Sequence, residues 1–196
     1  MHGLINRSIQ CFLRDTYGAA LWAAVTREAG LEFESFEPML TYDPALTEAV
    51  IAAAARVLDR PRDSVLEDLG TYLVSHENSE RLRRLLRFGG VGFVDFLHSL
   101  EDLPGRARLA LPDLDLPVLE VSDHAPEAFS LLCRSPIAGA GHVILGLLRA
   151  MADDYGALVL LEHQGAGPEG EVIAIQLLET GFAAGRSFDL AAWAGP

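Results

Sequence analysis

The sequence predicts an α+β domain: an N-terminal helical subdomain packed on a C-terminal antiparallel sheet that carries one or two helices. Three observations lead to this prediction. Residues 1–103 place apolar side chains at helical spacing, residues 118–178 contain four short strand-like runs, and one helical segment interrupts those runs. The order of two strands, one helix and two strands is typical of an antiparallel sheet with a helix on one face.

Turn-forming residues divide the first half into helices. Gly18 and Gly30 end the first two apolar stripes. Asp43 and Pro44 are expected to begin the next helix, because aspartate caps a helix and proline fits its first turn. Pro61 lies at the start of a further helix.

The end of the helical half is marked by glycine and proline. The charged segment 80–87 is separated by Gly89-Gly90 from an apolar stripe over residues 93–103. Pro104-Gly105 then follows, and we expect this pair to end the helical half.

The second half alternates between strand and helix patterns. Residues 139–155 return to helical periodicity, and residues 165–168 form the loop of a hairpin. The strand-like runs are 118–121, 128–133, 158–161 and 172–178. We therefore expect one domain over residues 1–180, with a helical part over about 1–103, an α/β part over about 104–180, and a tail over 181–196.

The composition is that of a globular protein. Half of the residues are apolar, 22% are charged, and the formal net charge is −13. Such acidity excludes nucleic acid and anionic membrane surfaces as general partners. With two cysteines, no secretory signal and no run long enough to span a membrane, the chain is expected to be cytoplasmic.

Several motifs, in the same order along the chain, resemble those of the H-NOX family, the heme-nitric oxide/oxygen-binding domains. The resemblance covers roughly residues 1–180. It rests on Met1-His2-Gly3-Leu4-Ile5-Asn6, Tyr17-Gly18, Trp22, Thr41-Tyr42-Asp43, Leu46, Leu100-Glu101-Asp102-Leu103, Leu111-Pro112, Pro117, Ser135, Gly139, Val143, Gly146 and Leu147. Family members occur alone in bacteria and at the start of soluble guanylate cyclase.

The resemblance implies a function in gas sensing. A heme would lie between the two halves, and nitric oxide binding would shift the helical half, which a signalling enzyme in trans reads. By resemblance that partner is a diguanylate cyclase, phosphodiesterase, histidine kinase or chemotaxis protein. The heme or ligand pocket would be lined by Leu4, Ile5, Pro117, Cys133, Ser135, Val143 and Leu147. The alternative for each apolar member is ordinary core packing.

The departures from the family pattern concern how the heme is held. The family's iron ligand is a histidine, and its position here is Pro104, whose side chain has no donor atom. The family holds the propionates with Tyr-x-Ser-x-Arg, whereas this chain has Cys133, Ser135 and Ile137 at those positions. Arg134 is an imperfect substitute, because on a strand it points to the face opposite residue 137.

Two histidines are alternatives near the expected pocket. His98 is a candidate iron ligand, although on a continuous helix it lies about 9 Å and about 240° from Pro104. Its other interpretation is a half-exposed residue beside an apolar stripe. His142 is expected to face a loop. Val143 cannot donate a hydrogen bond, so a heme pocket here would be of the nitric-oxide-selective type.

Two further features can be interpreted as structural or as functional. Cys133 is either a thiolate ligand or redox sensor, or a buried structural cysteine. The group Arg81, Arg83, Arg84 and Arg87 is either a solvated helix face or a docking surface.

No catalytic constellation is visible, so we expect the chain not to be an enzyme. It lacks a phosphate-binding glycine loop, a nucleophile elbow and a histidine pair at metal-ligand spacing. Two functional hypotheses remain. One is a heme-based sensor domain; the other is a heme-free module of the same fold that binds a partner or another apolar molecule.

Overall fold

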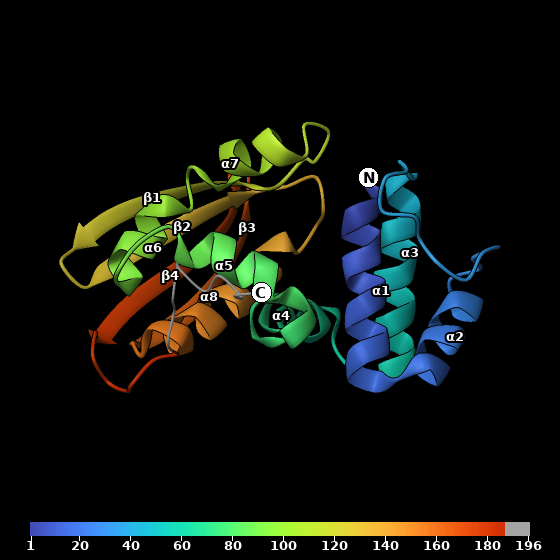
Figure 1. The fold of residues 1–196 in the computed structure, drawn as a ribbon, viewed down its shortest axis with the longest axis horizontal. Coiled ribbons are helices and arrows are strands. Elements are labelled where there is room, and N and C mark those ends of the chain that lie inside the picture. The colour runs from blue at the N-terminus through green and yellow to red at the C-terminus, as the bar shows by residue number, and fades with distance from the viewer. Residues whose placement is uncertain (187–196) are drawn as a thin grey trace, which may run out of the picture.

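The structure is a computed structural model that describes residues 1–186. Helices precede the sheet, and one helix is inserted between its two hairpins (Figure 1). The elements are α1 (Gly3–Tyr17), α2 (Ala19–Glu28), α3 (Pro44–Leu58), α4 (Arg62–Ser75), the 3-10 helix η1 (Glu77–Ser79), α5 (Glu80–Arg87), α6 (Phe93–Ser99), α7 (Leu103–Ala110), β1 (Val118–Ala125), β2 (Ala128–Arg134), α8 (Ala140–Tyr155), β3 (Leu158–Gly167) and β4 (Gly170–Glu179).

The four strands form one antiparallel sheet in the order β1-β2-β4-β3. The predicted α+β class is thereby confirmed. The register pairs Leu119 with Cys133 and Leu131 with Ile173. Because successive side chains alternate between faces, this register puts one apolar row under the helices. Each strand runs beyond its predicted apolar segment, since the polar residues of the turns continue the pairing.

The predicted helix start at Asp43 is confirmed. The Asp43 carboxylate accepts a hydrogen bond of 2.9 Å from the Ala45 amide, and Pro44 occupies the first turn. In the second half of the chain, helix α8 ends at Gly156, whose backbone is left-handed with φ 73°.

The expectation that Pro104-Gly105 ends the helical half is wrong. A separate helix, α7, begins at Leu103 and carries Pro104 in its first turn. Proline is compatible with this place because the first amides of a helix have no partner within it. The same break puts His98, on α6, and Pro104 on different helices, so the calculation for one continuous helix does not hold.

Two apolar clusters form the interior. The N-terminal core comes from α1 to α4 and the loop after α2, whereas the sheet core joins α5, α6 and α8 to the strands. Figure 1 shows α1, α2 and α3 at one end, the sheet at the other, and α4 between them. The helical half is therefore not one packing unit, because α5 and α6 cover the sheet.

Helices α4 and α8 connect the two ends of the molecule at a close crossing. A Cβ atom added at Gly70 would lie 1.9 Å from the carbonyl oxygen of Val143, and one at Gly146 would lie 1.9 Å from that of Glu67. Both distances are far inside van der Waals contact. The two glycines therefore let the backbones touch, and this fixes α8 against the helical end.

The arginine group of α5 does not form one solvated face. Arg81 and Arg84 are exposed, but Arg83 is buried and its Nε lies 2.8 Å from Asp154 Oδ1. Arg87 Nε lies 3.5 Å from the other oxygen of Asp154, and its guanidinium covers the Tyr155 ring at 4.0 Å. Two of the four arginines, Arg83 and Arg87, thus attach α5 to α8.

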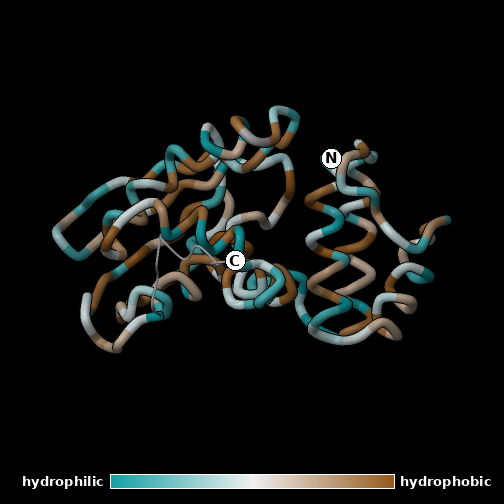
Figure 2. The backbone as a smooth tube through the Cα atoms, in the orientation of Figure 1, coloured by the Kyte–Doolittle hydropathy of each residue, from teal (hydrophilic) through white to brown (hydrophobic). Residues whose placement is uncertain are grey.

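Hydrophobic and hydrophilic residues alternate along helices such as α1 and α3 (Figure 2). Consistent with this pattern, no helix within residues 1–186 is both long and apolar enough to cross a membrane.

Candidate functional site

Pro104 lies buried in the first turn of α7, next to Leu103 of the sheet core. The ring is saturated and its nitrogen is part of the main chain, so no rotamer offers iron a lone pair. The side chain of Pro104 therefore cannot ligate a metal.

The turn after β2 contains the remnant of the propionate motif. The Ser135 hydroxyl accepts a hydrogen bond of 3.1 Å from the Ile137 amide and so stabilises the turn. Ile137 is half-buried and packs against both cores. The side chain that replaces the family arginine thus contributes packing between the cores and no positive charge.

Arg134 does not take over the role of that arginine. Its guanidinium makes two contacts with the Glu120 carboxylate across the β1–β2 pair, one of them 2.8 Å long, and both side chains are about half-exposed. Because neighbouring strand residues point to opposite faces, Arg134 lies on the outer face while Cys133 is buried.

Cys133 lies in the sheet core, with 1% of its surface exposed, opposite Glu171 on β4. Burial raises the pKa of Cys133 to about 12, and the charge of Glu171 adds to this shift. The thiol is therefore protonated near neutral pH. A reactive or iron-binding cysteine needs the thiolate, so this environment favours a structural role.

The remaining predicted pocket residues divide between the two cores. Ile5 and Val143 pack at the edge of the N-terminal core, and Leu147 belongs to the sheet core. Leu4 in the first turn of α1 and Pro117 directly before β1 are each half-buried. Members of the set thus occur in both cores, and the family resemblance places the pocket between the two halves.

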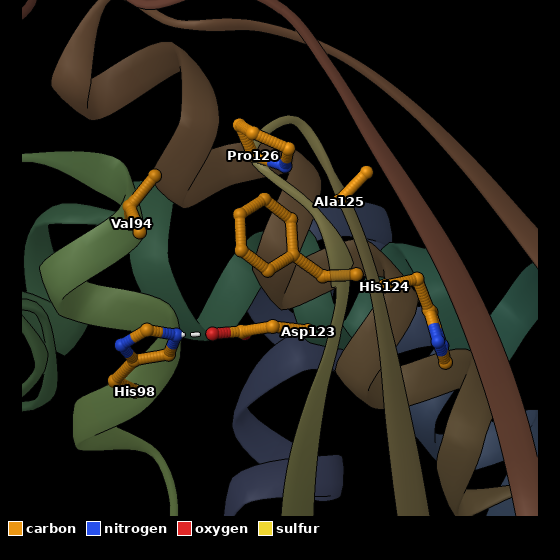
Figure 3. Close-up of a pocket in the computed structure, with 7 residues that line it drawn as sticks. Val94, His98, Asp123, His124, Ala125 and Pro126 are labelled. Carbon is orange, nitrogen blue, oxygen red and sulfur yellow. Dashed lines mark hydrogen bonds and ion pairs between the residues drawn. The ribbon is translucent and has the colours of Figure 1, made fainter.

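His98 is exposed on α6, and its Nε2 lies 3.0 Å from Asp123 Oδ1 on β1. Figure 3 shows this pair beside Val94 and Pro126, at an open hollow of ≈ 360 Å³. None of the predicted pocket residues lines that hollow. A surface ion pair is thus the contact that the structure gives His98, and it is not turned toward the pocket residues.

His142 faces helix α4 and strand β3, and the expectation that it faces a loop is wrong. Its Nε2 is 3.6 Å from Asp63 Oδ2 and its Nδ1 is 3.5 Å from Glu67 Oε1. The ring stacks on His163, with ring centres 4.0 Å apart. Sequence reasoning missed this pair because 21 residues separate the two histidines, and only the sheet and the helix crossing bring them together.

The sequence profile of the family described as Haem-NO-binding matches residues 2–163. The chain belongs to the Haem-NO-binding, or H-NOX, family. The soluble guanylate cyclase gcy-31 of Caenorhabditis elegans is 25% identical over 154 residues, which is 79% of this chain and 22% of that protein. The soluble guanylate cyclase 89Db of Drosophila melanogaster is 22% identical over 155 residues, which is 79% of this chain and 23% of that protein.

Solved H-NOX structures share the fold of this H-NOX domain. An H-NOX protein from S. oneidensis, in its Fe(II)NO state, superposes with a TM-score of 0.76 at 16% identity, covering 91% of this chain and 100% of that one. The unliganded Fe(II) H-NOX protein from K. algicida gives 0.76 at 20% identity, covering 92% and 98%. The domain spans less than a quarter of the length of the two cyclases that it matches.

The residues of this H-NOX domain do not fit the family's way of holding heme. The ligand position is Pro104, the propionate arginine is replaced by Ile137, and the nearby Arg134 is turned to the outer face. Burial raises the pKa of Cys133, which disfavours the thiolate that iron binding needs. The fold is retained, whereas the positions that the resemblance assigns to the iron ligand and the anion anchor hold Pro104 and Ile137, which can supply neither contact.

Proposed function

We propose that this H-NOX domain is a sensor and signalling domain of the cytoplasm that acts on a separate enzyme. The observation that carries the proposal is the family match over residues 2–163, on a fold in which α4 and α8 join two cores. A ligand bound along that boundary changes the position of one core relative to the other. By family membership, heme-based nitric oxide sensing is the first form of this function.

The partner in this proposal is a diguanylate cyclase, phosphodiesterase, histidine kinase or chemotaxis protein, as the family resemblance implies. The domain itself has a signalling role and is not the catalyst. Relatives named as soluble guanylate cyclases support a link between this type of domain and nucleotide signalling.

A heme-free form of the function is favoured by Pro104. The domain then binds another apolar molecule, or a protein partner, through the same boundary between the cores. The loss of both the iron ligand and the propionate arginine supports this form, because the two losses remove separate contacts to one cofactor.

The absorption spectrum separates the two forms. The purified protein is incubated with one equivalent of hemin, reduced, and measured with and without nitric oxide. A stoichiometric Soret band that nitric oxide shifts supports the heme-based sensor, and loss of the band in His98→Ala would identify a displaced ligand. A folded protein without any band supports the heme-free form.

A further inference from the structure

We propose that His142, His163 and Glu171 form a site for a divalent metal ion, and that Zn²⁺ is the ion bound. One donor atom from each of the three side chains lies within 4.8 Å of the other two. Two imidazoles and one carboxylate are a donor set that zinc accepts, with a fourth position left for water. The site does not depend on heme, because none of its residues is a predicted heme contact.

Three different elements hold the donors. His142 lies in the first turn of α8, His163 on β3 and Glu171 at the start of β4. Their side chains are between 11% and 15% exposed, so the site is mostly shielded but open to an entering ion. Donors on a sheet and on a packed helix are better fixed than donors on loops.

Gly141 lets the start of α8 lie directly on the other two donors. Its amide donates a hydrogen bond of 3.2 Å to Glu171 Oε2. A Cβ atom at this position would be 2.7 Å from that oxygen and 2.8 Å from His163 Nε2. The backbone therefore approaches the pair more closely than a larger residue permits.

The hydrogen bonds define the protonation state that an ion would meet. The Gly165 amide donates to His163 Nδ1 at 3.2 Å, so that nitrogen carries a lone pair. The proton of the neutral ring is then on Nε2, which lies 2.9 Å from Glu171 Oε2. When Nε2 binds a metal, this proton moves to Nδ1, and the Gly165 amide in the exposed hairpin turns to water instead.

The charges around the site favour a cation. Asp63 and Glu67 of α4 face His142, and Glu171 faces His163, so three carboxylates surround two imidazoles. Arg149 lies 3.1 Å from Glu67 and compensates one of them. Arg62, at the edge of this region, contacts Glu48 at 2.8 Å. A surplus of negative charge thus remains next to the donors.

One ring nitrogen of His142 makes no hydrogen bond. Among the described residues, its buried Nδ1 has no hydrogen-bond partner, and Glu67 Oε1 lies 3.5 Å away. A buried nitrogen in this state is unfavourable, and it calls for a ligand or a water. The structure around it supplies carboxylates but no hydrogen-bond donor to this atom.

Binding requires a small closure of the site. The two rings are stacked with an interplanar angle of 17°, so their lone pairs run side by side. Donors on a tetrahedral zinc ion are about 3.3 Å apart, given Zn–N and Zn–O distances of about 2.0–2.2 Å. The donors lie within 4.8 Å of one another, and His163 Nε2 is 2.9 Å from Glu171 Oε2, so small shifts of the rings and the carboxylate give this separation. The bound ion then ties α8 to β3 and β4.

The test uses the 196-residue chain, free of heme, after removal of metals with EDTA. Zinc binding is measured by calorimetry, and Co²⁺ serves as a visible probe of coordination geometry. We expect one equivalent of Zn²⁺ per chain, an intense tetrahedral Co²⁺ spectrum, and weaker binding at pH 5.5 than at pH 7.5, because protons compete for the imidazoles.

Variants identify the donors. His163→Ala and Glu171→Gln should each lower the zinc affinity by at least about tenfold, since even residues behind metal ligands contribute that much. His98→Ala and His124→Ala are the matched controls: both histidines are exposed and both contact a side chain, Asp123 and Ser130. These two variants should bind zinc as the wild type does.

Two results would overturn the proposal. One is a folded wild-type chain that takes up less than one equivalent at micromolar zinc. The other is an affinity that the control variants reduce as much as the donor variants do, which indicates scattered surface binding. Circular dichroism establishes that each variant is folded, and the wild-type stoichiometry and Co²⁺ spectrum decide the matter even if a variant does not fold. The presence or absence of a Soret band has no bearing on either result.

Discussion

At the scale of single residues, the environment of each side chain decides whether its chemistry is available. Cys133 carries a potentially reactive sulfur, but it lies in the sheet core opposite Glu171. His98 carries a metal-binding ring, but it pairs with Asp123 at the surface. His142 was expected to face a loop, and instead it contacts a second histidine and the carboxylates of Asp63 and Glu67. The environments of Cys133 and His98 thus agree with their structural interpretations, a buried cysteine and a surface histidine, and only the environment of His142 differs from the one expected.

The buried thiol of Cys133 should make stability depend on pH. Folding favours the neutral thiol, because burial raises the pKa of Cys133 from 9.0 to about 12. The resulting stability is present below pH 9 and is lost as the pH rises toward 12. We expect Cys133 to account for a loss of about 1 kcal/mol in unfolding free energy between pH 8 and pH 10.

Urea unfolding at the two pH values, on the wild type and on Cys133→Ala, measures this effect. The loss of unfolding free energy between pH 8 and pH 10 should be smaller in Cys133→Ala than in the wild type. Cys11→Ala should show the same loss as the wild type. An equal pH dependence in all three proteins would contradict the assignment.

The buried carboxylate of Asp154 should be among the most sensitive single positions. Its side chain is 1% exposed and its Oδ1 is 2.8 Å from Arg83 Nε. Asp154→Ala removes this carboxylate from the buried guanidinium of Arg83. We expect the change to lower the free energy of unfolding by about 3–5 kcal/mol. Glu28→Ala removes an exposed partner of Arg56 and should change stability by less than about 1 kcal/mol. Chemical denaturation of both variants compares them, and similar losses would show that burial does not govern these pairs.

At the scale of elements, the crossing of α4 and α8 joins the two cores. The crossing is close because Gly70 and Gly146 each face a backbone carbonyl of the other helix. Glycine normally weakens a helix, so its presence at both contact points has a packing reason. The same crossing brings Asp63 and Glu67 to His142, and it thus builds part of the proposed metal site.

Alanine at Gly70 or Gly146 should destabilise the domain. Each new methyl group would lie 1.9 Å from a carbonyl oxygen, so the helices must separate, at a cost of about 1–3 kcal/mol or more. Gly105→Ala is the matched control, because nothing lies within 4 Å of its Cβ position in helix α7. That variant should be unchanged or up to about 1 kcal/mol more stable.

Thermal and urea unfolding of the three variants give the comparison. If Gly70→Ala and Gly146→Ala unfold at the wild-type urea concentration, the close contact between α4 and α8 does not exist in solution.

At the scale of the whole molecule, α4 and α8 join two cores, and members of the predicted pocket set occur in both. The family fold is retained, while the position that the resemblance assigns to the iron ligand holds Pro104. In the function that we propose, a ligand bound between the cores changes their relative position, and this step does not require the heme contacts.

Restoring the missing donor should restore heme affinity. We expect Pro104→His to bind heme at least about tenfold more tightly than the wild type, because the imidazole supplies the nitrogen that the proline lacks. Pro104→Ala, which frees the helix start without adding a donor, should bind as the wild type does. Hemin titrations followed at the Soret band measure both. Equal affinity in the histidine and alanine variants would show that residue 104 does not face the heme.

The sequence by itself determined the α+β class, the chain order of two strands, one helix and two strands, the capped start at Asp43 and the family. These follow from local periodicity, turn chemistry and motifs, which are properties of residues near one another in the chain. It also predicted from Pro104 alone that the usual iron ligand is absent.

Only the tertiary structure decided how the helices divide between two cores, that α7 continues past Pro104, and that Arg83 is buried. It alone brought His142, His163 and Glu171 together. The physical reason is that these outcomes depend on contacts between residues far apart in the chain, made by a helix crossing and by strand register, and no local pattern records such contacts.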